Sequence, residues 1–172
     1  VIGLGLKDAL QYLLPEVPEK KYGTIVEKFR IHYQSINTKN SLYPHVREGL
    51  KELKEAGFTL AVATGKNRSG LDAALEITGL ENFFSVTRCA DEDKPKPNPK
   101  MLKWIMKTTG FNEQSTLMVG DTTHDLLMAN KADSAGLAVT YGAHSKAALL
   151  QLSPIACIDD SKELFKWIRK NA

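Results

Sequence analysis

From residue 44 onward, short segments with the composition of β-strands alternate with longer segments that carry helical periodicity. The strand-like segments are residues 58–63, 84–87, 117–120, 136–141 and 157–158. Strands separated by helices pair in parallel, because a parallel pair needs a crossover connection and a helix supplies it. We therefore predict an α/β fold, a doubly wound parallel sheet with helices on both faces.

The first forty residues show helical patterns only. Apolar residues with helical spacing occur at Ala9, Leu10 and Leu13, and again at Tyr22, Ile25, Val26 and Phe29. Pro15 and Pro18 interrupt the pattern between the two runs, and residues 37–41 form a polar linker. We predict a partial helical lobe at residues 1–40, with both apolar faces in a core, and an α/β core at residues 41–172.

Composition places the chain among ordinary globular proteins, with 172 residues, 42% of them hydrophobic and 25% charged. The net charge of +3 comes from lysines spread along the chain, which does not indicate nucleic-acid binding. No segment approaches the roughly 18 apolar residues of a membrane span. Cys89 and Cys157 form no C-x-x-C pair, so we predict a protein of the reducing cytoplasm. The oligomeric state stays open.

Two acids follow the strand-like segment 117–120. Asp121 and Asp125 are four residues apart, so one helical turn would bring both carboxylates to one side. Acids beyond the carboxyl end of a buried strand lie where open α/β sheets bind ligands. Two such oxygen donors suit Mg²⁺, which takes one or two carboxylates and fills its octahedron with water and phosphate. The alternative is that both acids only stabilise the positive helix N-terminus.

A second strand-like segment leads into Thr64-Gly65-Lys66. A hydroxyl and backbone amides at the start of a helix can bind a phosphate. The loop is not a Walker A loop, because Leu60 stands in place of the first glycine and Asn67 in place of Ser or Thr. Taken alone, the loop favours an ordinary turn with an incidental threonine.

The third polar loop is Lys94-Pro-Lys-Pro-Asn-Pro99. Prolines restrict the backbone, so a lysine among them can be oriented at small entropic cost. A fixed ammonium group would screen the two acids and hold a phosphoryl oxygen; the alternative is a stiff solvated loop. Since loops after parallel strands meet at one edge of the sheet, the three loops together indicate a phosphoryl-transfer site that uses Mg²⁺.

These segments resemble the motifs of the haloacid dehalogenase-like hydrolase superfamily, and of its phosphoglycolate-phosphatase-like members. The resemblance implies a Rossmann-like core in which Thr64 binds the phosphoryl group, with the Gly65 and Lys66 amides beside it. It makes Lys96 the site lysine, since its spacing to Met101 fits better than that of Lys94. It assigns Asp121 and Asp125 to Mg²⁺, and residues 1–40 to part of a substrate-selecting helical cap.

One motif of that family has no counterpart here. Its Asp-x-Asp, which supplies the nucleophile and the general acid, follows the first core strand. The only such spacing in this chain, Asp91-Glu-Asp93, is interpreted as part of a charged loop ahead of Lys96. We expect the nucleophilic Asp to lie upstream of this chain, the chain alone to be inactive, and the sheet to have two unpaired edges where the first strand is missing.

The leading hypothesis is therefore a Mg²⁺-dependent phosphatase of a small phosphorylated metabolite, phosphoglycolate-like or a sugar phosphate. A signalling receiver domain is one alternative, although its acids precede its Thr and Lys. A catalytically silent protein that binds a phosphometabolite or a protein partner is the other. Two weaker signals remain: His124, expected to face solvent or to support the metal ligands from behind, and Gly142-Ala-His144, which follows a late strand.

Overall fold

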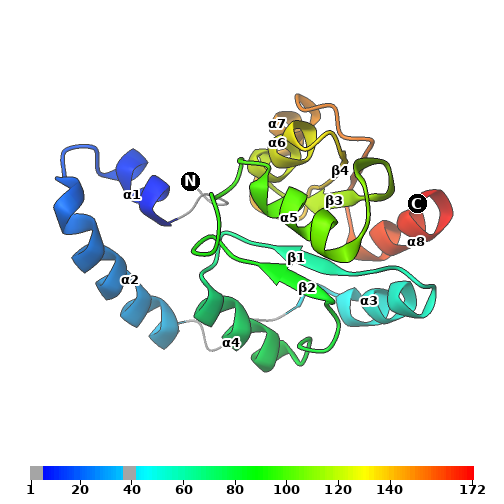
Figure 1. The fold of residues 1–172 in the computed structure, drawn as a ribbon, viewed down its shortest axis with the longest axis horizontal. Helices are drawn as coiled ribbons and strands as arrows, with labels where there is room; N and C mark the ends of the chain where they lie inside the picture. The colour runs from blue at the N-terminus through cyan, green and yellow to red at the C-terminus, as the bar shows by residue number, and fades with distance from the viewer. Residues whose placement is uncertain (1–5, 37–41) are drawn as a thin grey trace.

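The computed structural model describes residues 6–36 and 42–172, an α/β part with a small helical lobe beside it (Figure 1). The elements of the α/β part are α3 (Val46–Glu55), β1 (Ala61–Ala63), α4 (Arg68–Thr78), β2 (Val86–Arg88), α5 (Lys100–Thr109), η2 (Glu113–Ser115), β3 (Leu117–Gly120), α6 (Thr123–Lys131), β4 (Ala135–Val139), α7 (Lys146–Leu150), β5 (Ala156–Ile158) and α8 (Ser161–Asn171). Every strand pairing within the described ranges is parallel. The predicted α/β fold is confirmed.

The strands form two separate sheets, β1 with β2, and β3, β4 and β5 in that order. Ala61 lies opposite Val86 in the first sheet, and Leu137 lies opposite Ala156 in the second. Within the described residues, β1 and β3 do not pair with each other, so each has one side without a partner strand. This arrangement agrees with the expected two unpaired edges.

Helices cover both faces of the strands, as a doubly wound fold requires. One core contains Leu53 of α3, Leu137 and Val139 of β4, and Leu164, Phe165 and Ile168 of α8, with Leu117 and Val119 of β3 packed against it. The other contains Met101, Leu102 and Met106 of α5 and Met128 and Ala129 of α6, with Ala63 of β1 and Met118 of β3 packed against it. Helix α5 therefore contacts strands of both sheets, and alternate residues of β3 face opposite cores.

The first strand is shorter than the predicted segment 58–63. The amides of Gly57 and Phe58 donate to the carbonyls of Lys54 and Leu53, the two bonds of a Schellman motif that ends α3. Gly57 has a φ of 91°, the left-handed conformation that commonly follows a helix end. Phe58 is thus part of the helix cap, and pairing begins only at Ala61.

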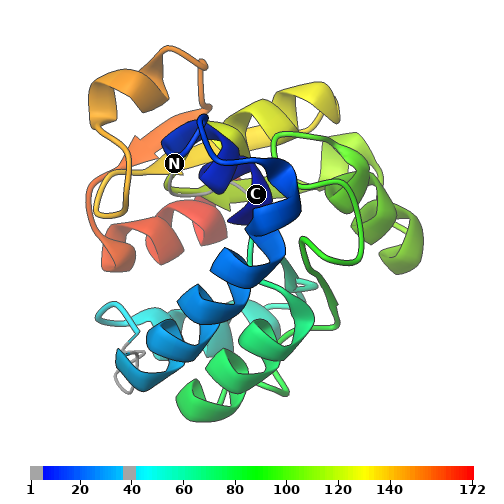
Figure 2. The same ribbon diagram turned by 90° about the vertical axis from the view of Figure 1, so that its left-hand side faces the viewer.

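The lobe consists of α1 (Leu6–Leu13), the short 3-10 helix η1 (Glu19–Lys21) and α2 (Tyr22–Ile36). It stands to one side of the α/β part, and α2 runs along that side (Figures 1 and 2). Leu10 and Tyr22 are buried, but Leu13 and Phe29 are 57% and 48% exposed. The prediction that both apolar faces are core is therefore wrong for these two residues, because two helices bury little surface between them. The predicted linker at 37–41 and the opening residues 1–5 lie outside the described residues.

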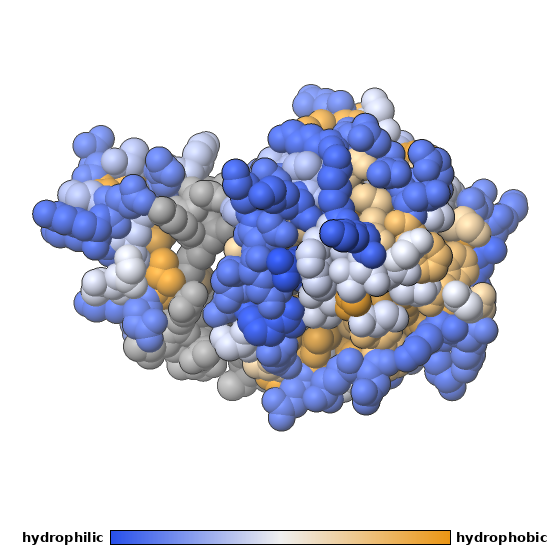
Figure 3. All heavy atoms as spheres, viewed as in Figure 1, coloured by the Kyte–Doolittle hydropathy of each residue, from blue (hydrophilic) through white to orange (hydrophobic). Residues whose placement is uncertain are grey.

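The surface of the α/β part is mixed. Figure 3 shows hydrophilic residues along its margins and on the outer side of the lobe, with apolar residues visible between them. In the part of the chain that the structure describes, no helix has the length and hydropathy that crossing a bilayer requires.

Candidate active site

The turn between β3 and α6 organises the two predicted metal ligands. Thr122 is the N-cap of α6, and its hydroxyl accepts from the Asp125 amide. The Asp125 carboxylate folds back, and its Oδ2 accepts from the Thr122 amide at 3.1 Å and hydroxyl at 2.7 Å. This is a reciprocal capping box. The expectation that one helical turn relates the two acids is wrong, since Asp121 precedes the N-cap and lies in the turn itself.

The other oxygen of Asp125 is paired with a lysine. Lys96 Nζ lies 2.5 Å from Asp125 Oδ1, and the two side chains are 10% and 5% exposed. Lys94, the alternative lysine, is exposed. The loop after β2 therefore brings Lys96, and not Lys94, to the acids that follow β3.

Asp121 is held by the segment that follows β4. Its Oδ2 accepts from the Ala143 amide at 2.8 Å, and its main-chain carbonyl accepts from the His144 amide at 3.1 Å. No donor within the described residues reaches Asp121 Oδ1. One carboxylate oxygen is thus fixed by the protein and the other is available to a ligand.

These donors fit Mg²⁺. The described residues contain no group of three or more His, Cys, Asp and Glu side chains that could surround a metal ion. Mg²⁺ does not need such a group, because it keeps several waters and is bound through one or two carboxylates plus substrate phosphate. Asp121 offers a free oxygen for direct coordination, whereas Asp125, engaged by Lys96 and Thr122, is suited to binding the water shell.

The loop Thr64-Gly65-Lys66 closes on itself. The Thr64 hydroxyl accepts from the Lys66 amide at 3.1 Å, and the Thr64 amide donates to the Arg88 carbonyl of β2. The first amide of α4, on Arg68, is already occupied by the carboxylate of Asp91, at 3.0 and 3.2 Å. The start of α4 therefore presents fewer amides to a phosphate than the sequence indicated, and Gly65 and the Thr64 hydroxyl are the groups that remain.

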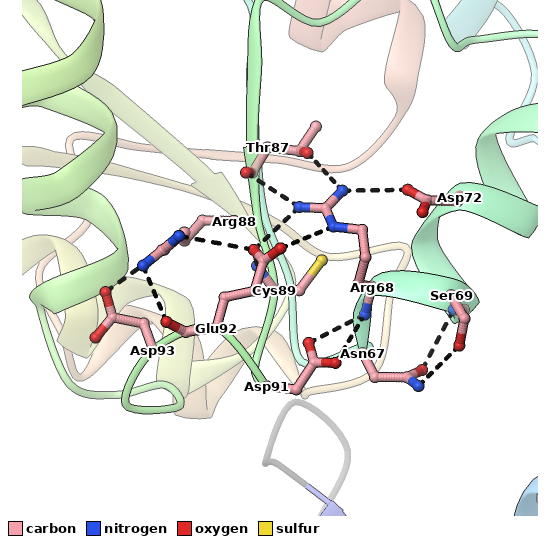
Figure 4. A network of polar contacts seen from close by, with 11 residues as sticks. Asn67, Arg68, Ser69, Asp72, Thr87, Arg88, Cys89, Asp91, Glu92 and Asp93 are labelled. Atoms are coloured by element: carbon pink, nitrogen blue, oxygen red, sulfur yellow. Dashed lines mark hydrogen bonds and ion pairs between the residues drawn. The ribbon is translucent and has the colours of Figure 1, made fainter.

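A network of charged residues lies behind this loop, and sequence reasoning did not find it (Figure 4). Arg68 donates to both oxygens of Glu92, at 2.8 and 3.0 Å, and to Asp72 and Thr87. Glu92 also accepts from the Cys89 amide. The hydrogen bond from Arg68 and that from the Cys89 amide lower the pKa of Glu92, against the effect of burial. The network connects the Thr64 loop to the charged loop ahead of Lys96.

Asp91 and Asp93, which carry the only Asp-x-Asp spacing, are both part of this network. Asp91 caps α4, and Asp93 lies 3.6 Å from Arg88. The guanidinium of Arg88 stacks 4.3 Å from the centre of the Trp104 ring. Both acids have structural partners, in agreement with their interpretation as a charged loop.

Two histidines lie next to the acids. The rings of His124 and His144 are 5.7 Å apart in an edge-to-face arrangement. His124 is half-buried, and its Nδ1 has no hydrogen-bond partner within the described residues. Burial and the neighbouring His144 lower the pKa of His124. His124 is thus closer to the predicted supporting position than to a solvent-facing one.

The structure pairs Lys96 with Asp125, places Asp121 in the turn that leads to Asp125, and places Thr64 directly after β1 of the other sheet. Sequence reasoning missed Thr122 and Ala143. The pattern Thr122-x-x-Asp125 is a capping-box signal and could have identified Thr122. Ala143 acts through its main-chain amide, for which no residue type is diagnostic.

Comparison with known proteins shows which proteins the chain is similar to. The chain is 37% identical over 168 residues to the "Probable phosphatase IndB" of Dickeya dadantii (strain 3937), covering 95% of this chain and 73% of that protein. It is 34% identical over 174 residues to the "Phosphoglycolate phosphatase" of Vibrio vulnificus (strain CMCP6), covering all of this chain and 76% of that protein. A hydrolase from Pseudomonas syringae has the same fold, with a TM-score of 0.89 at 20% identity, over 99% of this chain and 80% of that one.

A family model described as "Haloacid dehalogenase-like hydrolase" matches residues 1–139, a span that contains all three loops of the site. The chain therefore belongs to the haloacid dehalogenase-like hydrolase family, and within it is similar to the phosphoglycolate phosphatases.

Proposed function

We propose that this chain supplies the phosphoryl-binding and metal-binding groups of a Mg²⁺-dependent phosphatase that acts on a small phosphorylated metabolite. The observation that carries the proposal is the buried pair of Lys96 and Asp125 beside Asp121. A lysine paired with an acid after a parallel strand, with a second acid in the same turn, suits the binding of a phosphoryl group next to a metal ion. The two phosphatases named above, to each of which the chain is more than 30% identical, support the same reaction class.

Each group has a role that follows from its position. Lys96 neutralises charge on the phosphoryl group, and its pairing with Asp125 keeps its ammonium in place. Thr64 and Gly65 bind phosphoryl oxygens from the end of β1, with Lys66 at the start of the next helix. Asp121, through Oδ1, and Asp125 hold the metal. Bound Mg²⁺ would polarise the phosphoryl oxygens and neutralise the charge that develops on them.

We further propose that the nucleophilic aspartate is carried upstream of residues 1–172, on a strand that pairs with β1 and β3. The support is that these two strands, which lead into the Thr64 and Asp121 loops, have no partner on one side. Attack of its carboxylate oxygen on phosphorus would form a P–O bond and break the ester P–O bond, and the leaving alkoxide would take a proton from a second acid. Water would then cleave the aspartyl-phosphate and release inorganic phosphate.

The substrate we propose is a phosphoglycolate-like ester or a sugar phosphate, on the basis of the similarity to phosphoglycolate phosphatase. The lobe at residues 1–40 is proposed to be part of a cap that selects it, with residues 41–172 as the core. A cytoplasmic location is proposed because Cys89 and Cys157 are free thiols.

The test compares the 172-residue chain with the product of the whole gene. Both are assayed for phosphate release from 2-phosphoglycolate and from a set of sugar phosphates, with Mg²⁺ or with EDTA. We expect turnover by the whole gene product only, dependent on Mg²⁺ and lost in Lys96→Ala. Turnover by the 172-residue chain would show that the nucleophile lies within it. Binding of metal and phosphate without turnover by the whole gene product would favour a catalytically silent binding protein.

A further inference from the structure

The segment that follows β4 makes two hydrogen bonds to one residue, Asp121. The Ala143 amide donates to the carboxylate and the His144 amide donates to the main-chain carbonyl, at 2.8 and 3.1 Å. One contact orients the side chain and the other fixes the backbone that carries it. These two bonds connect the ends of two adjacent parallel strands, β3 and β4.

Gly142 provides the space for this contact. A Cβ added at Gly142 would lie 2.2 Å from both Cβ and Oδ2 of Asp121, far inside van der Waals contact. The φ of Gly142 does not lie in the left-handed region, so backbone conformation does not require glycine here. Because the overlap includes Asp121 Cβ, rotation of the carboxylate alone cannot relieve it, and the two segments would have to move apart.

His144 attaches the same segment to the start of α6. Its Nδ1 accepts from the Thr123 amide at 3.1 Å. Thr123 is the first residue of α6, and its amide has no partner within the helix. The imidazole thus satisfies a helix-end donor that lies two residues from Asp121, and this holds the turn between the two acids against the segment after β4.

We propose that Gly142, Ala143 and His144 are positioning residues for the Asp121 carboxylate, which fix its Oδ2 and leave Oδ1 available to Mg²⁺. The proposal rests on the proposed function, since it assumes that Asp121 is a metal ligand. Partners of metal-binding carboxylates typically contribute ten- to a hundredfold to metal affinity. None of the three residues needs to touch the metal or the substrate for this effect.

The first experiment is Mg²⁺ titration of the 172-residue chain by isothermal calorimetry. Gly142→Ala is expected to weaken Mg²⁺ binding by about tenfold or more. Gly23→Ala, which adds the same methyl group in α2 where nothing lies within 4 Å, is the matched control and is expected to bind as the unchanged chain does. Equal Mg²⁺ affinity for Gly142→Ala and the unchanged chain would overturn the proposal.

The second experiment uses His144 and does not depend on whether Gly142→Ala folds. His144→Ala removes the acceptor for the Thr123 amide and is expected to weaken Mg²⁺ binding, whereas His144→Asn places an amide oxygen near the position of Nδ1 and is expected to restore most of it. Equal Mg²⁺ affinity of the two variants, or weaker binding by His144→Asn than by His144→Ala, would show that an acceptor for the Thr123 amide is not what matters. Either result would contradict the proposal for His144.

Amide hydrogen exchange, measured without metal, tests the positioning of Asp121 independently of whether the chain binds Mg²⁺. The amides of Ala143 and His144 are expected to be protected in the unchanged chain and to exchange faster in Asp121→Ala and in Gly142→Ala, while the α8 amides keep their protection. Unaltered protection in these variants would overturn the positioning role. If the unchanged chain shows this protection but does not bind Mg²⁺, the metal site of the proposed function is wrong, and the positioning of Asp121 stands.

Discussion

Lys96 and Asp125 form a buried ion pair, 2.5 Å apart, between the loop that follows β2 and the first turn of α6. The second oxygen of Asp125 accepts from the amide and hydroxyl of Thr122, so that both carboxylate oxygens have donors. This pairing joins the loop that carries Lys96 to the turn that carries Asp121 and Asp125. A buried charge is tolerated only when it is paired in this way.

Removal of the lysine charge should be costly for stability. Lys96→Met leaves the 5%-exposed carboxylate of Asp125 without its cation. Removing one partner of a buried pair typically lowers the free energy of unfolding by about 3–5 kcal/mol. Urea denaturation followed by circular dichroism would measure this loss. Lys94→Met, at an exposed position in the same loop, is expected to change stability by no more than about 0.5 kcal/mol. Similar losses for the two variants would contradict the assignment of Lys96 as the buried partner.

Gly49 allows α3 to approach α8. A Cβ at this position would lie 2.1–2.4 Å from ring atoms of Phe165. Alanine normally stabilises a helix relative to glycine by about 1 kcal/mol, but here the overlap should reverse the sign. We expect Gly49→Ala to lower the free energy of unfolding by about 1–3 kcal/mol, as overpacked cores do. Combining it with Phe165→Leu should recover part of the loss. A more stable Gly49→Ala variant would show that the two helices separate without cost.

Cys89 should be inert as a nucleophile. It is completely buried, and burial raises the pKa of its thiol to about 11. Cys157 is only half-buried. Because the thiolate is the reactive form, iodoacetamide at pH 8 should modify Cys157 faster than Cys89 in the folded protein. Mass spectrometry of the Cys89→Ser and Cys157→Ser variants would assign the rates, with denatured protein as the control in which both react. Faster modification of Cys89 would contradict its burial.

The contribution of Glu92 to stability should depend on pH. Its bonds from Arg68 and the Cys89 amide lower its pKa below the ordinary value of 4.5, so the folded state binds this proton less readily than the unfolded state. The stabilisation is therefore complete above pH 4.5 and is lost as the pH falls through the folded-state value. Urea denaturation should show the unchanged chain more stable than Glu92→Gln at pH 7, with a smaller difference below pH 4.5.

The matched control for this comparison is Glu55→Gln. Glu55 is 65% exposed and lies 3.7 Å from Lys51, and surface pairs of this kind contribute little. It should show a small difference at both pH values. A difference for Glu92→Gln that does not vary with pH would mean that its carboxylate charge is not what stabilises the network.

Local patterns predicted the fold well where the physical cause is local. A glycine directly after a helical pattern predicts the end of the helix, and Gly57, Gly79 and Gly110, which hold such positions, all adopt a positive φ because a helix end often needs a left-handed residue. The sequence Asn98-Pro99 predicts Asn98 as the N-cap of α5, because asparagine is a preferred N-cap and proline suits the first helical position. In the structure Pro99 holds the N-cap position, and Asn98 accepts from the Lys100 amide. The difference is a single residue, which is within the usual variation of helix boundaries.

Features of the site that depend on distant parts of the chain were not predictable in this way. Arg68 and Glu92 are 24 residues apart and share no periodicity, and the Ala143 amide that binds Asp121 is 22 residues from it. The rule that loops after parallel strands meet at one edge of a sheet was enough to predict that the three motif loops belong to one site. Which oxygen of each carboxylate is occupied depends on side-chain and main-chain donors that only the folded chain brings into contact.

The separation of the two sheets has a consequence for how the site can be modified. Within the described residues no strand pairing connects β1 with β3, so the spacing between Thr64 and Asp121 is not fixed by a hydrogen-bonded ladder. Apart from the Lys96–Asp125 pair, it depends on the apolar core beneath α5, in which Met101 is completely buried. Methionine adapts its shape more readily than branched side chains do. In the described chain, an apolar substitution at Met101 is therefore expected to act on the spacing between Thr64 and Asp121 through packing alone, whereas the upstream strand proposed above would add a hydrogen-bonded ladder between them.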